Sequence, residues 1–218
     1  APTGVYAALV AEDGFTGAPA ALIEFDDAAF VWGDLGQRWL TEEQYIKNYP
    51  VCRWAHAPID GALALRAEHK LSPADIARVE IRTFKYSAQL WRGIPGSSPV
   101  AQYAISWPVA AALARGRVGV EEISEAAFAD PEICRLTLAT EAIVDEECER
   151  SYPQRRLGRV TLVLKDGRRL ESGLREASGG PVPQPTHDDV VEKFRRFATP
   201  ALGRARAAEV ERLALAQT

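Results

Sequence analysis

Apolar and polar residues alternate along two neighbouring runs in the second half of the chain. Residues 159–165 read RVTLVLK, residues 168–174 read RRLESGL, and Asp166-Gly167 lies between them. A period of two is typical of strands with one buried face, and Asp-Gly favours a type I′ turn. The pattern therefore predicts a β-hairpin. Alternation over Val79 to Phe84 predicts another half-buried strand, and β-branched residues in 136–144 predict one more.

Helical patterns occupy both ends of the chain and parts of its middle. Ser72-Pro73 is typical of a helix start that lasts a single turn, and Thr186 with Asp189 forms a capping box. Glycine and proline residues in 178–185 predict a linker. The other predicted helices are 4–12, closed by Asp13-Gly14, a short one within 20–32, and then 59–69, 108–115, 121–128, 131–134 and 200–215.

This order of elements predicts an α+β fold in three parts. Residues 46–180 form a small α+β domain with an antiparallel sheet, and residues 1–45 and 181–218 are helical. Each helical end is too short to bury its apolar face well by itself. We therefore expect both ends to belong to one all-helical domain that is mostly absent from this sequence.

Composition narrows the class of protein. Of the 218 residues, 47% are hydrophobic and 26% charged, and the net charge is −4 without a basic cluster. This balance is typical of globular proteins and argues against nucleic-acid binding or a membrane partner, as does the lack of an apolar run of about 20 residues. Three separated cysteines without a CxxC motif favour a reducing, cytoplasmic location. Three dispersed histidines indicate no local metal site.

The segment KNYPVCRWAHAPID, residues 47–60, concentrates reactive side chains. Pro58 suits a first helical turn, which places His56 at a helix N-terminus, where the dipole favours a neutral imidazole that accepts protons. Asp60 lies four residues on and could orient the ring. The alternative is that His56 merely caps the helix and Arg53 pairs at the surface. Cys52 is either a nucleophile or a small packed residue.

The segment SSPVAQYAISWPVAAALARGR, residues 97–117, predicts a loop leading into an apolar helix. Tyr103 lies near the start of that helix, where it could donate a proton or bind a carboxylate. The alternative is a packed tyrosine. No GxGxxG, Walker, GxSxG or HExxH motif occurs in the sequence.

These segments together resemble the MmgE/PrpD family, which includes 2-methylcitrate dehydratase, cis-aconitate decarboxylase and iminodisuccinate epimerase. The specific parts are the Lys-x-Tyr-Pro-x-Cys-Arg-x-x-His-x-x-x-Asp run and the AQYAISWPVAAALARGRVG run. The segments GVYAALVAEDGFTGAP, IARVEIRTF, GRVTLVLKDGRRLE and THDDVVEKFRRFA fall in the same order as in the family. The resemblance covers essentially the whole chain, which is similar to the C-terminal half of members about twice as long.

The resemblance implies an active site between a helical domain and the α+β domain, with His56 and Tyr103 as catalytic residues. Lys47 and Arg53 are then candidates for binding substrate carboxylates. The remaining site residues would come from the N-terminal half. The resemblance also implies a reaction without metal or cofactor and a small polycarboxylic acid as substrate. The expected partners are a second copy in a homodimer and a separate N-terminal helical half.

Three functions remain open at this point. The first is a lyase, a dehydratase or decarboxylase that removes a proton alpha to a carboxylate and expels water or carbon dioxide. The second is an epimerase of a dicarboxylic amino or imino acid, which needs two acid/base groups flanking one carbon. The third is a non-catalytic fragment or subunit that binds a separate helical chain. The absence of methionine and the Ala-Pro-Thr start lead us to expect a fragment.

Overall fold

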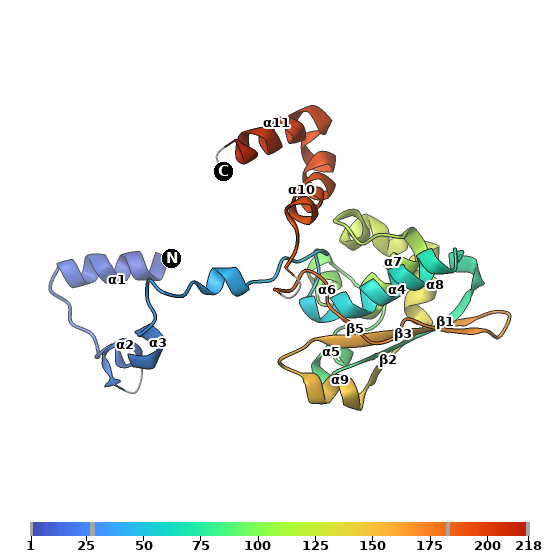
Figure 1. Ribbon diagram of the computed structural model, residues 1–218, viewed down its shortest axis with the longest axis horizontal. Helices are drawn as coiled ribbons and strands as arrows, with labels where there is room; N and C mark the ends of the chain where they lie inside the picture. Colours follow the sequence, from blue (N-terminus) through green and yellow to red (C-terminus); the bar gives the residue numbers. More distant parts are fainter. Residues whose placement is uncertain (1, 27–28, 182–183, 217–218) are drawn as a thin grey trace. The chain divides into compact units, whose positions relative to one another are not determined.

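The computed structural model describes residues 2–26, 29–181 and 184–216 (Figure 1). The chain divides into two units, Ala1–Gln44 and Tyr45–Thr218. The division falls one residue before the predicted boundary between the helical end and the α+β domain. Residues 27–28 of the predicted short-helix region and residues 182–183 of the predicted linker lie outside the described residues.

The first unit consists of short helices, and its described residues form no buried core. It contains α1 (Pro2–Glu12), α2 (Ala21–Glu24), α3 (Ala29–Trp32) and the 3-10 helix η2 (Leu40–Glu43). The helix predicted for 4–12 is thus confirmed, and the short helix predicted within 20–32 appears as two separate turns. Every residue of 2–44 whose exposure is described is exposed, including Phe30 at 83% and Phe15 at 69%.

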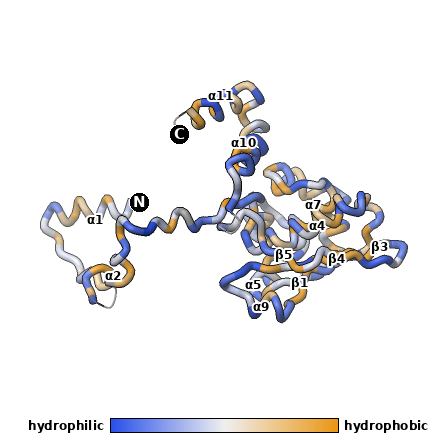
Figure 2. Tube along the Cα trace, viewed as in Figure 1, coloured by the Kyte–Doolittle hydropathy of each residue, from blue (hydrophilic) through white to orange (hydrophobic). Residues whose placement is uncertain are grey.

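The second unit holds the α+β domain, whose class is confirmed. Its elements up to the last strand are η3 (Arg53–Ala55), α4 (His56–Glu68), η4 (Pro73–Asp75), β1 (Ile76–Thr83), α5 (Lys85–Ala88), α6 (Ser98–Gln102), α7 (Ser106–Arg115), η5 (Glu121–Ile123), η6 (Glu125–Ala129), α8 (Pro131–Leu138), β2 (Thr140–Val144), α9 (Glu146–Ser151), β3 (Leu157–Leu164), β4 (Arg169–Glu171) and β5 (Arg175–Glu176). Figure 2 shows hydrophobic residues along the strands and hydrophilic ones at the tip of the β3–β4 hairpin.

The sheet is mixed rather than purely antiparallel. Its order is β2-β1-β3-β4, and β5 pairs with β3 beyond the end of β4. The pairs of β3 with β1, β4 and β5 are antiparallel, whereas β2 is parallel to β1. The chain between β1 and β2 passes through helices α5 to α8, and such a long crossover returns a strand in the same direction. The periodicity of apolar residues along a strand does not indicate whether the strand pairs in a parallel or an antiparallel direction, so the parallel pair was not predicted.

The predicted hairpin is present, but its turn is not type I′. Gly167 has φ +87°, whereas Asp166 is not among the described residues with positive φ. The Gly167 amide donates to the Leu164 carbonyl at 3.0 Å, and the Leu164 amide donates to the Arg168 carbonyl at 2.9 Å. These bonds define a three-residue loop, in which a type I turn is followed by a glycine bulge. Such a loop needs positive φ only at the glycine.

Two further predictions differ from the structure, one in a boundary and one in the type of helix. Residues 136–138 belong to α8 rather than to a strand, because Asp130 caps the helix through the Glu132 and Ile133 amides and Leu136 is buried. The strand therefore begins only at Thr140. Residues 121–129 form two 3-10 helices instead of one α-helix. The single turn after Ser72 is confirmed, with both bonds of a capping box.

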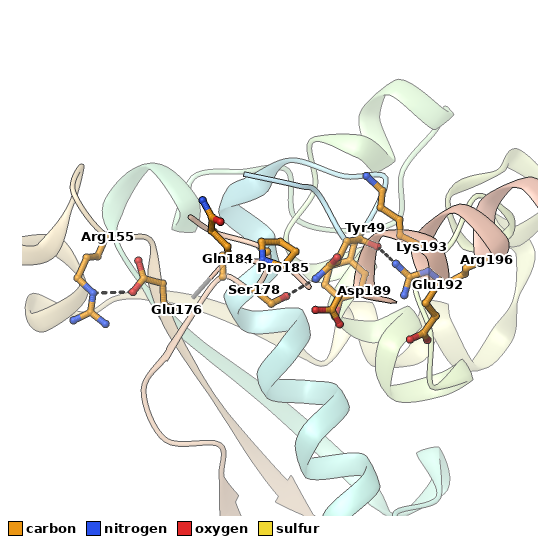
Figure 3. A pocket seen from close by; sticks show the side chains of 14 residues that line it. Tyr49, Arg155, Glu176, Ser178, Gln184, Pro185, Asp189, Glu192, Lys193 and Arg196 are labelled. Carbon is orange, nitrogen blue, oxygen red and sulfur yellow. Dashed lines mark hydrogen bonds and ion pairs between the residues drawn. The ribbon is translucent and has the colours of Figure 1, made fainter. Parts of the chain in front are cut away.

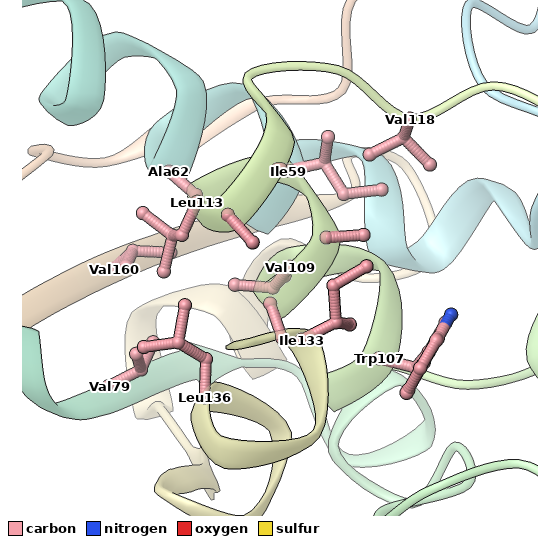
Figure 4. Close-up of a cluster of buried hydrophobic side chains, with 14 of the residues drawn as sticks. Ile59, Ala62, Val79, Trp107, Val109, Leu113, Val118, Ile133, Leu136 and Val160 are labelled. Atoms are coloured by element: carbon pink, nitrogen blue, oxygen red, sulfur yellow. The ribbon is translucent and has the colours of Figure 1, made fainter. Parts of the chain in front are cut away.

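The core lies between one face of the sheet and helices α4, α7 and α8 (Figures 1 and 4). The sheet contributes Val79, Ile81 and Val160 to it, and α7 contributes Trp107 and Leu113. All residues of this main cluster come from positions 49–164. This core fixes α4, and through α4 it fixes His56.

The chain ends in α10 (His187–Leu202) and α11 (Arg204–Leu215), joined at Gly203. The predicted capping box is confirmed, since Thr186 and Asp189 exchange both of its hydrogen bonds. Arg195 pairs with Glu211 at 2.8 and 2.5 Å and links the two helices. No described residue of α10 is buried. Within the described ranges, no helix has the length and apolar character to cross a bilayer.

Candidate functional site

The segment 47–60 runs from an extended stretch into the first turn of α4, as predicted. The Cys52 amide donates to the Gln102 carbonyl at 2.7 Å, which ties the stretch to the end of α6. A 3-10 turn over Arg53–Ala55 follows, and α4 begins at His56. Pro58 lies in the first turn, where its missing amide hydrogen is not needed. The sequence therefore located His56 correctly at the helix N-terminus.

His56 is completely buried, with an exposed fraction of 0%. Its Nε2 lies 3.4 Å from the Val51 carbonyl, and its ring meets the ring of Tyr49 edge-on at a centroid distance of 5.0 Å. Nδ1 is buried and has no hydrogen-bond partner among the described residues. When Nε2 carries the proton and faces the carbonyl, Nδ1 is left as an unoccupied acceptor.

The ring of His56 is neutral at physiological pH. Burial lowers the pKa of His56 to about 3, and the positive charges of Arg53 and Lys47 act in the same direction. The neutral form was predicted from the helix dipole, but desolvation of the ring is the larger cause. The backbone of Val51 and of Tyr49 near the ring opposes the shift only in part.

Arg53 is buried and holds a backbone turn. Its guanidinium donates to the Ser178 carbonyl and, at 2.8 Å, to the Ala177 carbonyl, and it lies 4.5 Å over the ring of Tyr45. Burial lowers the pKa of Arg53. Its Nε is buried without a partner among the described residues. Lys47, the other predicted carboxylate-binding residue, is exposed.

Asp60 does not orient His56. Its carboxylate accepts from the Tyr49 hydroxyl at 2.5 Å and from the Ser178 amide at 3.0 Å. The i,i+4 spacing suggested contact with His56, but that imidazole is turned into the core while Asp60 faces the 177–180 turn. The Tyr49–Asp60 pair was not predicted from the sequence, although both residues lie within the segment 47–60.

Tyr103 lies at the end of α6, shortly before α7, and is 64% exposed. Its carbonyl accepts from the Trp91 amide at 3.0 Å, whereas no hydrogen bond of its hydroxyl is found among the described residues. His56 is buried and Tyr103 is exposed, and neither lines the two cavities described below. A shared cavity for the pair therefore stays a prediction.

Two cavities lie on either side of Tyr49. The larger, of about 580 Å³, has a mixed polar and apolar lining and lies between α10 and the 176–180 segment (Figure 3). The smaller, of about 440 Å³, is mostly apolar and lies between α10 and the 116–122 loop. Lys193 and Arg196 of α10 reach the larger cavity, and Arg196 also lines the smaller one. Sequence reasoning assigned these two residues only to a helical tail.

Cys148 is a buried free cysteine. Burial raises the pKa of the Cys148 thiol to about 12, so this cysteine stays protonated and unreactive. The part of the chain that the structure describes contains no group of three or more histidine, cysteine or acidic residues placed to hold a metal ion.

Comparison with known proteins identifies the class to which this domain belongs. Residues 49–217 match the MmgE/PrpD C-terminal domain, and the match covers the α+β domain together with α10 and α11. Members of the family are generally lyases or dehydratases. The chain belongs to the MmgE/PrpD family, as its sequence motifs indicated. No curated protein matches the chain.

Proposed function

We propose that this chain is the C-terminal part of a lyase that acts on a small polycarboxylic acid, such as 2-methylcitrate or cis-aconitate. The reaction removes a proton alpha to a carboxylate and then expels water or carbon dioxide. Membership of the family supports the reaction class. The observation that carries the proposal is His56, a buried and neutral imidazole whose Nδ1 has no partner among the described residues.

His56 is the proposed base, and Arg53 the proposed partner for a substrate carboxylate. Arg53 keeps one buried donor, Nε, without an acceptor in the described part of the chain, and its charge already acts on His56. A pKa of about 3 is low for a general base. A bound polycarboxylate raises it, because an opposite charge nearby favours imidazolium.

Lys47 and Tyr103 complete the proposed set, as a second carboxylate-binding residue and as the acid for the leaving group. Both are exposed, and the proposal expects a helical N-terminal part to close over them. The proposal includes a homodimer in the cytoplasm and a reaction that needs no cofactor or metal, in line with the family resemblance.

The test compares two histidines of the same helix in the enzyme that includes the N-terminal helical part. His56 begins α4, and the exposed His69 follows its last residue. His56→Gln keeps hydrogen bonding but cannot take up the proton, so we expect turnover to fall by about 100- to 10,000-fold. His69→Gln should leave turnover unchanged. Near-normal turnover of His56→Gln would show that the base lies elsewhere.

Two further measurements refine the same test. Tyr103→Phe should lower turnover without lowering the melting temperature, because the side chain is 64% exposed. Proton NMR in deuterium oxide separates the reaction classes, since exchange at the alpha carbon without elimination would favour the epimerase. An unchanged rate for Tyr103→Phe would remove Tyr103 from the proposed set.

A further inference from the structure

The larger cavity is lined by charged groups that are bonded within the protein and by two positive charges on α10 that form no ion pair among the described residues. Arg155 and Glu176 form an ion pair at 2.8 Å, and Asp189 accepts from the Thr186 amide and hydroxyl, each at 2.7 Å. The carboxylates of Glu176 and Asp189 are therefore bonded within the protein, and Figure 3 draws the Arg155–Glu176 pair. Glu192 also lines the cavity, but it is exposed and forms no ion pair among the described residues.

Lys193 and Arg196 supply the unpaired charge. They lie three residues apart on α10, which makes them neighbours on one face of the helix. Arg196 donates to the Asn48 carbonyl at 2.6 Å, and Lys193 forms no ion pair or hydrogen bond within the described ranges. Partial burial lowers the pKa of Lys193, and the charge of Arg196 lowers it further. Asp189 and Glu192 line the same cavity, but neither forms an ion pair with Lys193 or Arg196 among the described residues. The two cations repel each other, and an anion between them relieves that repulsion.

The opposite wall of the cavity is rigidly held. The turn at 177–180 is bound by Arg53 through two carbonyls and by Asp60 through the Ser178 amide. Gly179 has φ +76°, and its carbonyl accepts from the Ile46 amide at 2.8 Å. Tyr49 lines the cavity as well, with its hydroxyl committed to Asp60. A site between these walls is preorganised on this side, which lowers the entropic cost of binding.

We propose that Lys193 and Arg196 bind the carboxylates of a small di- or tricarboxylate in this cavity. The volume of about 580 Å³ lies in the range of roughly 300–1,000 Å³ that is usual for small-molecule sites. The proposal that this cavity binds an anion depends only on the cavity and on the charges of Lys193 and Arg196. The choice of a polycarboxylate rests on the proposed function. His56 does not line this cavity, but Tyr49 does and contacts the His56 ring.

Isothermal titration calorimetry of the 218-residue chain with citrate, at pH 7 and low salt, tests the proposal. We expect one site per chain, weakened by added salt, which screens partly exposed charges. Lys193→Gln and Arg196→Gln should each raise Kd by about tenfold, the effect of losing one charge-assisted hydrogen bond. Lys165→Gln is the matched control, because Lys165 is exposed in the loop of the hairpin and does not line the cavity.

Lys193→Gln is the decisive variant, because it removes no contact found among the described residues and so should not disturb folding. Absence of citrate binding, or an equal Kd for Lys193→Gln and Lys165→Gln, would overturn the proposal. Inorganic phosphate and acetate serve as further probes. Binding of either as tight as that of citrate would overturn the polycarboxylate assignment. Failure of the proposed function has a different signature, namely unchanged turnover in His56→Gln with citrate binding still dependent on Lys193.

Discussion

His56 shows how burial sets the chemistry of a single residue. The ring lies in the interior at the start of α4, with Arg53 close enough to disfavour its charged form. Nothing among the described residues accepts or donates at Nδ1. A buried polar atom without a partner costs free energy, so a residue retained in this state is a good candidate for a role beyond folding.

The low pKa of His56 predicts how stability depends on pH. The unfolded ring has a pKa near 6.5, whereas the folded ring has one of about 3. Between these values the unfolded chain binds the extra proton, so the stability contributed by neutral His56 is complete above pH 6.5 and is lost as pH falls toward 3. We expect this residue to reduce the free energy of unfolding by up to about 1.4 kcal/mol per pH unit within that window.

Urea denaturation at several pH values between 7 and 4 measures this dependence. His56→Gln lacks the titrating group, so its free energy of unfolding should fall less steeply than that of the wild type. His69→Gln should follow the wild type, because His69 is exposed. Parallel curves for wild type and His56→Gln would show that the ring is already accessible to protons in the folded chain.

Among the structural elements, the turn at 177–180 forms part of the wall of the larger cavity and is hydrogen-bonded to Asp60 of α4. Gly179 is the residue that makes this turn possible. A Cβ at this position would lie 2.2 Å from the Ile46 carbonyl oxygen, and φ is +76°. Because the neighbour is backbone, no side-chain rotation can relieve the contact.

Gly179→Ala should therefore destabilise the domain by more than about 2 kcal/mol, since positive φ alone costs about 1–2 kcal/mol and the contact adds to it. Gly173→Ala is the control, because Gly173 has φ +69° and no atom within 4 Å of an added Cβ. Chemical denaturation compares the two variants. Equal losses of stability would mean that the turn moves freely away from Ile46.

Sequence patterns predicted those elements whose signals are local. The helix cap at Ser72, the capping box at Thr186, the hairpin and the start of α4 at His56 each depend on residues close together in the sequence. The turn type at Asp166 and the limit between α8 and β2 were wrong. The turn type follows from the hydrogen bonds that close residues 164–168, and α8 continues to Leu138 with Leu136 buried in the core. Hydrophobic periodicity records neither feature.

In the whole molecule, the first unit exposes large apolar side chains that contact no hydrophobic core among the described residues. The main core draws only on residues 49–164, and residues 2–44 contribute no buried side chain among those described. Exposed aromatic residues such as Phe30 and Trp39 form surface that water disfavours. That the ends 1–45 and 181–218 pack against each other, or against another copy, stays a prediction.

Deleting residues 1–44 tests this prediction. The remaining chain should keep its sheet, with a melting temperature within about 2 °C of the parent, because the core is intact. Light scattering should show self-association for the 218 residues and less association after the deletion. A full chain that stays monomeric and binds a hydrophobic dye strongly would contradict burial of the ends.

The sequence by itself determined the α+β class, the family and the place of His56 at the start of α4. Each of these depends on local patterns or on motifs that keep their order along the chain. Only the tertiary structure decided that His56 is buried, that Asp60 serves Tyr49 and Ser178 instead, and that Lys193 and Arg196 reach a cavity beside Tyr49. Burial and pairing across more than a hundred residues depend on how the elements pack, and no local pattern encodes that packing.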